Sequence, residues 1–332
     1  MPQLKKQYTA KDFDTDQPSR WCPGCGDTAI LASVKNVLAN SGKNKEDIAF
    51  ISGIGCSSRF PYYVDTYGMH SIHGRAVAIA SGLKLHNPGI SVWVITGDGD
   101  GLAIGGNHFI HALRRNMDLN ILIFNNEIYG LTKGQYSPTT KIGQKTATSP
   151  YGTIEEPFVP SRLALGAGAT FFARSSASDL KHLQKTLTRA EAHKGTSVVE
   201  IYQNCVIFND QAFDEFLGRE HRDDNTIKLE HGERLIFGKN EKKVVVNQKG
   251  TFQIVDEESA DPSEVVIHDE KDINLAFMLA QMEEVKPLGV FYATERPGYA
   301  EQMHHQIEAA KNGEGKISMQ DLLHTGETWT VD

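Results

Sequence analysis

Five short apolar runs in the first two thirds of the chain constrain the fold more than any other feature of the sequence. They are IAFISGIG (48–55), SVWVITGDG (91–99), NILIFNN (120–126), ATFFAR (169–174) and SVVEIY (197–202). Runs of this kind are typical of parallel strands buried on both faces. Segments with helical periodicity lie between them, as at 30–38 and 180–190. The alternation predicts an α/β fold, with a doubly wound, mostly parallel sheet that binds ligands at the carboxyl ends of its strands.

The composition of the chain changes near residue 211. Residues 211–250 contain 16 charged residues in 40 and few apolar runs long enough for a core strand. We therefore predict a domain at 1–210 and a charged C-terminal extension at 211–332. Within the extension, 234–246 predicts a hairpin that turns near Gly238 to Asn240, and 274–284 and 299–312 predict helices. We expect the extension to pack on the core or on a partner subunit.

Composition and charge exclude some classes of function. The chain has 332 residues, 39% of them hydrophobic, and no apolar stretch long enough to cross a bilayer. Its net charge of −8 disfavours nucleic acid or an anionic membrane as the main partner. The first residues are polar and lack the apolar segment of a secretory signal. We expect a soluble, cytoplasmic protein.

Acidic residues stand between glycines after the second apolar run. Residues 97–106 read GDGDGLAIGG, but the dinucleotide-binding pattern G-x-G-x-x-G needs a third glycine where this chain has Leu102 or Ile104. An aspartate would repel a diphosphate unless a divalent cation lay between them, and Mg²⁺ binds oxygen ligands that include one or two carboxylates. Asp98 suits that task. The alternative is that GDG forms only a turn.

A second polar loop lies one strand-helix-strand unit later. NNEIYGLTKGQ (125–135) follows the third apolar run, and 25 residues separate Gly99 from Asn125. In a doubly wound sheet this spacing brings two neighbouring strand ends together. The amide oxygen of Asn126 and a carbonyl of the same loop are therefore predicted to complete the coordination of the cation.

The four cysteines are candidates for a metal site. Cys22 and Cys25 form a Cys-x-x-Cys knuckle in WCPGCGD, and Cys56 and Cys205 each follow an apolar run. The predicted sheet brings all four to the edge where the two polar loops gather. Four thiolates hold either zinc or a 4Fe-4S cluster. Free or buried thiols are the remaining alternative.

Several motifs together resemble a known family. The GDG loop, followed by about 25 residues and NN, resembles the thiamine diphosphate signature, which implies that Asp98, the Asn126 side chain and the Ile128 carbonyl hold Mg²⁺. The chain is also similar to the β subunit of a 2-oxoacid:ferredoxin oxidoreductase in WCPGCGD, GIGCSSR, HSIHGRA, GDGDGLAIGGNHFIHALRRN, NNEIYGLTKGQYSPTT and RPGYAEQ…GETWTV. This resemblance covers nearly the whole chain and is densest over 20–140. Within the family it is greatest to 2-oxoglutarate:ferredoxin oxidoreductases.

The resemblance implies a reaction, cofactors and partners. The reaction is the CoA-dependent oxidative decarboxylation of 2-oxoglutarate to succinyl-CoA and CO2, or its reverse, with electrons passed through the cluster to ferredoxin. An α subunit is expected to supply the carboxylate that activates the thiamine, in an α2β2 complex. An electron-rich thiamine adduct can reduce a nearby 4Fe-4S cluster but not zinc, which favours the cluster.

The resemblance also implies the roles of single residues. Cys22, Cys25, Cys56 and Cys205 are expected to ligate one 4Fe-4S cluster. The residues expected to contact thiamine diphosphate are Ile54, Gly55, Cys56, Ser57, His73, Gly97, Gly99, Asp100, Gly130 and Leu131. His73 would donate to the substrate carbonyl or the diphosphate. Lys133 would neutralise the distal carboxylate of 2-oxoglutarate, and a solvated loop lysine is the alternative.

Three rival functions stay open on the sequence. One is a thiamine-dependent decarboxylase in which zinc replaces the cluster. Another is a non-catalytic scaffold subunit held together by a metal. The third is an enzyme of the same family that oxidises pyruvate or a branched-chain 2-oxoacid.

Overall fold

The computed structural model describes residues 7–313, 318–329 and 331. Residues 1–6 of the predicted first domain, and 314–317, 330 and 332 of the predicted extension, lie outside the described residues. Within the described part, no helix has both the length and the apolar character that crossing a membrane requires.

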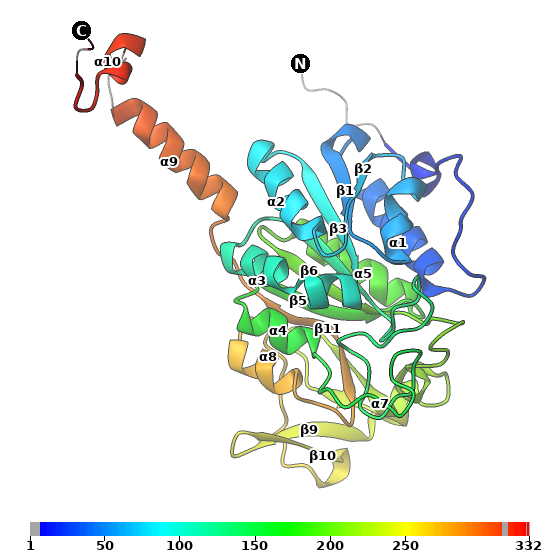
Figure 1. The fold of residues 1–332 in the computed structure, drawn as a ribbon. Helices are drawn as coiled ribbons and strands as arrows, with labels where there is room; N and C mark the ends of the chain where they lie inside the picture. Colours follow the sequence, from blue (N-terminus) through cyan, green and yellow to red (C-terminus); the bar gives the residue numbers. More distant parts are fainter. Residues whose placement is uncertain (1–6, 314–317, 330, 332) are drawn as a thin grey trace.

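A mostly parallel sheet forms the centre of the molecule (Figure 1). In the described residues it has eight strands in the order β2-β1-β3-β4-β6-β5-β11-β7. Strand β11 is antiparallel to β5, and the other neighbouring strands are parallel. The strands are β1 (Ile48–Ser52), β2 (Tyr67–His70), β3 (Ser91–Gly97), β4 (Asn120–Asn125), β5 (Phe171–Ser176), β6 (Ser197–Tyr202), β7 (Thr226–Leu229) and β11 (Lys286–Ala293).

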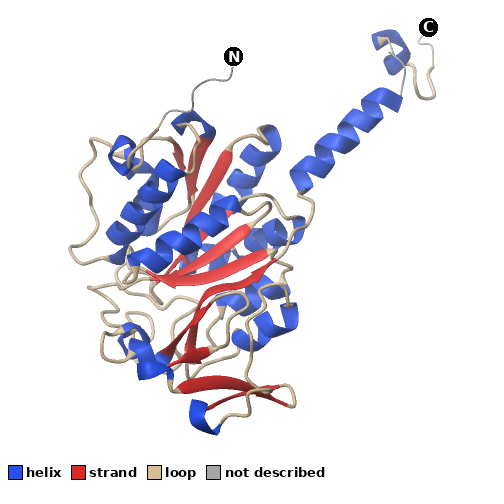
Figure 2. Ribbon diagram, turned by 180° about the vertical axis from the view of Figure 1, so that it is seen from behind, coloured by secondary structure: helices blue, strands red, loops and turns tan. Residues whose placement is uncertain are grey.

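Helices cover both faces of this sheet (Figures 1 and 2). One core cluster packs α2 (Ala76–His86), α3 (Gly106–Arg115), α4 (Pro160–Gly166) and α8 (Ile273–Leu279) against the sheet. The opposite cluster uses α1 (Gly26–Asn40) and α5 (Leu180–Ala192). Strand β3 shows why a continuous apolar run is required, since Val92 and Val94 enter the first cluster while Trp93 and Ile95 enter the second. The predicted doubly wound α/β fold is confirmed.

The five apolar runs are all strands, with small shifts at their ends. The first strand ends at Ser52 rather than at 55, because Gly53 to Cys56 already belong to the following loop. The run predicted at 169–174 forms a strand at Phe171–Ser176. Strands β2, β7 and β11 are findings of the structure that the sequence did not predict. The tetrapeptide of β2 is exposed throughout, so it has no apolar run to mark it.

The segment after residue 211 contributes to two sheets. Strands β7 and β11 extend the central sheet, whereas β8 (Ile236–Phe237), β9 (Lys243–Gln248) and β10 (Thr251–Asp256) form a small antiparallel sheet. The pairing of β8 with β9 corresponds to the hairpin expected at 234–246. Two short helices, α6 (Asp214–Leu217) and α7 (Arg222–Asn225), precede β7. The helix expected at 274–284 is shorter, because α8 ends at Leu279.

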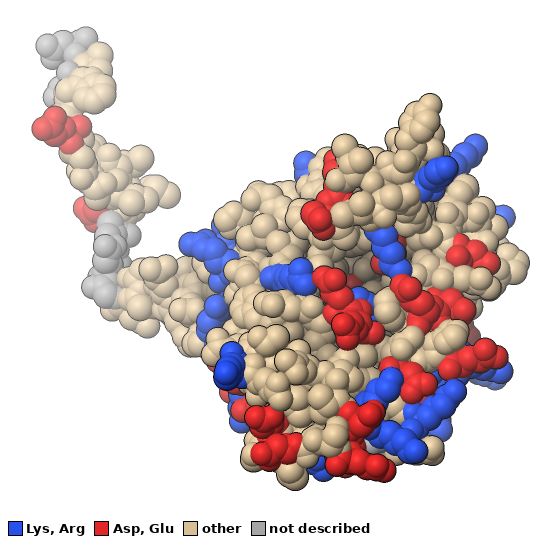
Figure 3. Space-filling view, turned by 90° about the horizontal axis from the view of Figure 1, so that it is seen from below, with Lys and Arg blue, Asp and Glu red and all other residues tan. Residues whose placement is uncertain are grey.

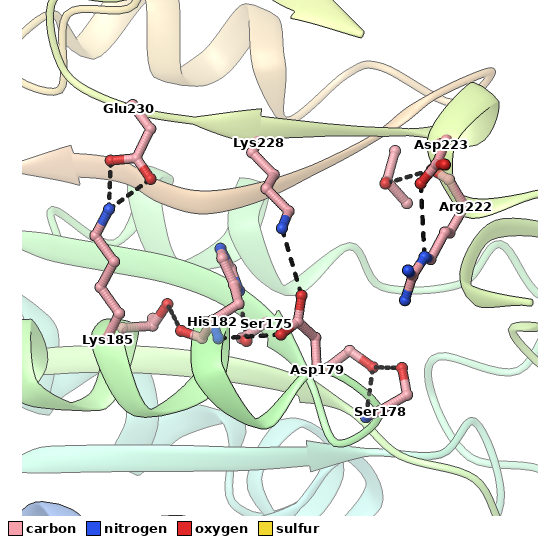
Figure 4. Close-up of polar contacts among 12 residues, drawn as sticks. Ser175, Ser178, Asp179, His182, Lys185, Arg222, Asp223, Lys228 and Glu230 are labelled. Atoms are coloured by element: carbon pink, nitrogen blue, oxygen red, sulfur yellow. Dashed lines mark hydrogen bonds and ion pairs between the residues drawn. The ribbon is translucent and has the colours of Figure 1, made fainter. Parts of the chain in front are cut away.

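Ion pairs join strand β7 and the residues around it to helix α5 (Figure 4). Lys185 of α5 pairs with Glu230, and Lys228 of β7 lies 3.5 Å from Asp179. Asp179 also caps α5 by accepting from the backbone N–H of His182. Ser175 bonds to the His182 ring in the same view, but Ser175 is fully buried and Asp179 contacts only the histidine backbone. The trio is therefore a helix cap and not a catalytic triad.

The last described helices project from the body as an arm (Figures 1 and 2). Helix α9 (Tyr299–Gly313) agrees with the predicted 299–312 and touches the body near its start, where His304 lies 3.2 Å from the Leu85 carbonyl. Ile307 and the side chains of α10 (Met319–Leu323) are exposed. On the face drawn in Figure 3, Lys and Arg side chains are interspersed with Asp and Glu.

Four neighbouring strands end at one edge of the sheet and position the candidate site. They are β1, β3, β4 and β6, which are adjacent in the strand order and parallel. The long connection from β4 to α4, residues 126–159, lies at the same edge and is folded by short bridges such as Tyr129 with Gln135. A connection of this length in a compact domain is usually functional.

Candidate functional site

A cavity of about 400 Å³ opens at the carboxyl ends of β1, β3, β4 and β6. Ligands of doubly wound sheets bind at this edge. The cavity collects most of the residues predicted from the sequence, which are Ile54, Gly55, Cys56, Ser57, His73, Gly97, Asp98, Gly99, Asp100, Asn126, Ile128, Gly130 and Leu131. Cys22, Cys25, Cys205 and Lys133 do not line it.

Asp98 is a buried residue of the cavity lining. It is 2% exposed, and its Oδ2 accepts hydrogen bonds of 2.6 Å from the hydroxyls of Ser137 and of Thr139. Burial raises the pKa of Asp98 above its usual range, while the two hydroxyls oppose the shift. In the part of the chain that the structure describes, no cation pairs with this carboxylate. A buried carboxylate of this kind is stabilised by a metal ion.

The loop after β4 supplies the other two predicted oxygen ligands. Asn126 and Ile128 line the cavity together, because the Asn126 amide oxygen accepts from the backbone N–H of Ile128. Between them Glu127 adopts a left-handed conformation, with φ of 56°. Asn125 anchors the loop by donating to Glu200 at 2.8 Å and accepting from Thr139 at 3.1 Å.

These residues fit a magnesium site. A carboxylate, an amide oxygen and a backbone carbonyl are hard oxygen donors of the kind that Mg²⁺ prefers. The glycines beside them leave room for an anionic group. A methyl group at Gly55 would meet no atom within 4 Å, whereas one at Gly99 would lie 2.3 Å from the Tyr129 ring. The Gly99 position therefore allows Tyr129 to close over the loop, and its hydroxyl donates to the Gly99 carbonyl at 3.0 Å.

Asp100 ties three loops of the cavity wall together. Its Oδ1 accepts from the backbone N–H of Ile54 and Gly74 and lies 2.7 Å from His73 Nδ1. Its Oδ2 accepts from Thr96 at 2.7 Å. A methyl group at Gly53 would lie 1.9 Å from that oxygen, so glycine is required there. Asp100 also starts a short π-helix, Asp100–Ile104, a distortion often found at functional sites.

His73 is positioned by this network. Because the Asp100 carboxylate accepts from Nδ1, the proton of a neutral ring is assigned to Nδ1, which leaves a lone pair on Nε2. The ring also packs edge-on against Tyr129 with centroids 6.1 Å apart. The His73 side chain is 38% exposed and lines the cavity. The Nε2 atom of His73 can therefore accept a proton from a bound group or return one to it.

The four cysteines gather beside the same cavity. The Cys25 N–H donates to the Cys22 carbonyl at 3.0 Å, which closes the knuckle. A methyl group at Gly130 would lie 3.5 Å from Cys205 Sγ and 3.6 Å from Cys56 Sγ, so these two sulfurs face one point.

The ionisation of the thiols supports this placement. Burial raises the pKa of Cys56 to about 11, and the nearby Asp27 carboxylate adds to the shift. Interaction with the Cys205 and Cys22 thiols raises it further, which places both near Cys56. Burial also raises the pKa of Cys25. Because thiolates are the ligands of a cluster or of zinc, the bound metal must supply the positive charge that stabilises them.

The cysteines lie in one neighbourhood without closing a compact site for a single ion. Over residues 7–313, 318–329 and 331, no three His, Cys, Asp or Glu side chains are arranged to hold one metal ion. Four cysteine thiolates are the donor set of a 4Fe-4S cluster and also of a structural zinc ion.

Two buried polar residues at the cysteine side of the cavity were not identified as site residues from the sequence. Asp27 is 1% exposed, and neither of its carboxylate oxygens has a hydrogen-bond partner. Burial raises its pKa to about 7. Gln203 is 2% exposed, and its Oε1 likewise has no partner. Both residues line the cavity.

Lys133 lies apart from the other predicted residues. It is exposed, adopts φ of 78° in the turn after Gly130, and does not line the cavity, although its neighbours Leu131 and Thr132 do. Its role in recognising a distal carboxylate stays a prediction.

A family model and two sets of relatives match the chain. The model is described as the thiamine pyrophosphate enzyme C-terminal TPP-binding domain, and it matches residues 53–201. The 2-oxoglutarate oxidoreductase subunit KorB of Mycobacterium tuberculosis is 48% identical over 100% of this chain and 91% of its own length. The 2-oxoglutarate synthase subunit KorB of Archaeoglobus fulgidus is 47% identical over 57% of this chain and 70% of its own length.

A solved structure matches the whole fold. It is described as 2-oxoglutarate:ferredoxin oxidoreductase from Magnetococcus marinus with 2-oxoglutarate, coenzyme A and succinyl-CoA bound. The match has a TM-score of 0.80 and 32% sequence identity, and it covers 98% of each chain.

Proposed function

The chain belongs to the β-subunit family of the 2-oxoacid:ferredoxin oxidoreductases, and from this premise we propose that it is the cofactor-binding subunit of a 2-oxoglutarate:ferredoxin oxidoreductase. The predicted family is thereby confirmed. The reaction is the CoA-acylating oxidative decarboxylation of 2-oxoglutarate, or its reverse. The substrate assignment is supported by the 2-oxoglutarate enzymes among the relatives at 48% and 32% identity.

The main support for this chemistry is the set of residues that lines one cavity. A single cavity is lined by the oxygen ligands Asp98, Asn126 and Ile128 and by Cys56, one of the four grouped cysteines. A magnesium-anchored diphosphate and an iron-sulfur cluster would therefore share one edge of one sheet. That juxtaposition would suit a reaction in which the cofactor supplies electrons and a nearby cluster accepts them.

The chain's own residues divide the work. Asp98, Asn126 and the Ile128 carbonyl hold Mg²⁺, and Ser137 and Thr139 hold Asp98 in place. Cys22, Cys25, Cys56 and Cys205 ligate the 4Fe-4S cluster. When bound, thiamine diphosphate supplies the nucleophilic carbon for decarboxylation, and the cluster accepts the electrons.

The remaining predicted contacts surround the diphosphate and the reacting end. Asp100 acts through His73 by fixing the proton on Nδ1, so that Nε2 faces the cofactor or substrate. The glycines leave the space that the cofactor fills. Leu131 and Gly130 form the wall next to Cys56. Lys133, which follows this loop without lining the cavity, would neutralise the distal carboxylate of the substrate.

The partners belong to the same proposal. A β subunit implies an α subunit, which supplies the carboxylate that activates the thiamine, in an α2β2 complex. Ferredoxin takes the electrons and coenzyme A takes the acyl group. A cytoplasmic location fits a chain whose cysteines must stay reduced.

Anaerobic co-expression with the α subunit tests the proposal. We expect four iron and four acid-labile sulfide per β chain, thiamine diphosphate binding that requires Mg²⁺, and bleaching of the visible iron-sulfur absorbance when 2-oxoglutarate and coenzyme A are added. Lys133→Ala should raise KM for 2-oxoglutarate far more than KM for pyruvate.

Other outcomes identify the rival functions. Zinc without sulfide would indicate a zinc-stapled decarboxylase. Failure to bind thiamine diphosphate would indicate a scaffold. Bleaching by pyruvate or a branched-chain 2-oxoacid, without bleaching by 2-oxoglutarate, would contradict the substrate assignment.

A further inference from the structure

Gln203 is built between the cysteines and the cofactor cavity. It directly follows β6, and its backbone N–H donates to the Asn125 carbonyl at 2.9 Å, which continues the pairing of β6 with β4. Its side chain packs on the first residue of α1, since a methyl group at Gly26 would lie 2.7 Å from Gln203 Cγ. Gln203 is 2% exposed, so its side-chain amide is buried.

The two ends of this amide face different groups. Nε2 donates to Cys25 Sγ at 3.1 Å. Oε1 has no hydrogen-bond partner in the described residues, although Gln203 lines the cavity that also contains Asp98 and Asn126. The orientation of the amide follows from the chemistry of sulfur, because a thiolate accepts hydrogen bonds and only the NH₂ group can donate one.

An N–H donor on a ligating sulfur changes the energy of electron uptake. Reduction adds negative charge to a cluster, and that charge spreads onto the sulfur ligands. A hydrogen bond to sulfur stabilises the reduced form more than the oxidised form, which is one of the ways in which proteins set cluster potentials.

We propose that Gln203 is a positioning residue that raises the reduction potential of the cluster through its hydrogen bond to Cys25. The inference rests on the proposed function, because it requires a 4Fe-4S cluster at the four cysteines. It goes beyond that function by assigning control of the potential to a residue that ligates no iron.

The test is a redox titration of the complete complex, followed by electron paramagnetic resonance. Gln203→Met keeps the length of the side chain and removes the donor. We expect the equilibrium constant for one-electron reduction to fall about tenfold, which is a shift of 59 mV to more negative potential. Gln203→Leu should shift the potential in the same direction.

A matched control is Gln135→Met, because Gln135 lines the same cavity but its amide bonds to Thr132 and to no sulfur. Its potential should equal that of the unmodified complex. Iron and sulfide content are measured for every variant.

The outcomes separate the two claims. An unmodified complex without iron and sulfide would overturn the proposed function itself. A full cluster in Gln203→Met and Gln203→Leu with an unchanged potential, or a shift equal to that of Gln135→Met, would overturn the inference alone. Loss of iron from both Gln203 variants while the complex stays folded would also overturn it, because Gln203 would then retain the cluster and not tune it.

Discussion

The two ends of the cofactor cavity differ in how far the protein satisfies its own polar groups. At the aspartate end, Asp100 accepts four hydrogen bonds from the chain, and Asp98 accepts two from hydroxyls. At the cysteine end, both oxygens of Asp27 and the Oε1 of Gln203 are buried without a partner. The pKa values of the Cys25 and Cys56 thiols are also raised by burial.

The difference shows which part of the site the polypeptide can organise alone. Buried polar groups that lack partners cost free energy, so the cysteine end is arranged for what it binds and not for the stability of the empty chain. The aspartate end is held by hydrogen bonds within the chain and needs only the cation. We therefore expect substitutions at the two ends to change stability in opposite directions.

The largest effect is expected for Asp100→Ala. The substitution leaves two backbone N–H groups, the buried one of Gly74 and the part-buried one of Ile54, without their acceptor. The Thr96 hydroxyl and His73 lose the same acceptor. We expect a loss of about 4 kcal/mol in the free energy of unfolding, measured in urea. A loss within the usual range of surface substitutions would show that the aspartate end is not the organised one. Asp16→Ala, at an exposed position of the chain, is the control.

Asp98→Ala tests whether cofactor binding at the aspartate end is independent of the cysteine end. We expect the affinity for thiamine diphosphate in the presence of Mg²⁺ to fall on the order of 100-fold in calorimetric titration, and Ser137→Ala to reduce it about tenfold through the position of Asp98. Iron content should stay unchanged in both variants. Equal loss of iron and of cofactor would mean that the two ends are not independent.

Asp27→Asn is expected to have a smaller effect of the opposite sign. The pKa of Asp27 is raised from about 3.8 to about 7 by burial, so between these values the folded chain keeps a proton that the unfolded chain has lost. The stability of the metal-free chain therefore falls as pH rises from about 4 to about 7, and it stays lower above that range. Asparagine has no such dependence.

The free energy of unfolding of Asp27→Asn should therefore exceed that of the unmodified chain by an amount that grows from about pH 4 to about pH 7 and is on the order of 2 kcal/mol at pH 8. Urea unfolding at several pH values measures it. If the two proteins differ in free energy of unfolding by the same amount at every pH, the pKa of Asp27 is not raised. If Asp27→Asn is less stable than the unmodified chain at pH 8, the cysteine end does not cost stability as we expect.

The sequence predicted the parts of the fold that depend on continuous burial. Runs such as 91–97 and 120–125 are apolar because both faces of their strands are covered, and this marks them without any tertiary information. Strand β11 was missed because it begins with Lys286 and Pro287 and contains Gly289 at φ of 132°, residues that are uncommon inside strands. In the structure it pairs with β5 on one side and β7 on the other, contacts that the local sequence does not reveal.

The candidate site was predictable where motifs mark it and not where folding creates the contact. Asp98, Asn126 and the cysteines stand in short motifs after strands, and the cavity brings most of them together. Ser137 and Thr139 lie within the NNEIYGLTKGQYSPTT motif, but the sequence does not show that they hydrogen-bond to Asp98, about 40 positions earlier in the chain. Helix α1 begins at Gly26, with Cys25 as its capping residue, so Asp27 lies inside the helix and is buried, which its motif alone does not show.

Strand β6 sits between β4 and β5 although it follows both in the chain. Cys205 is carried by the loop after this inserted strand, whereas the other three cysteines precede β3. The proposed ligand set is therefore complete in the fold only when β6 has taken its place between β4 and β5. If the four cysteines ligate a cluster as proposed, a chain that ends before Cys205 has only three of the four thiols and cannot complete the site.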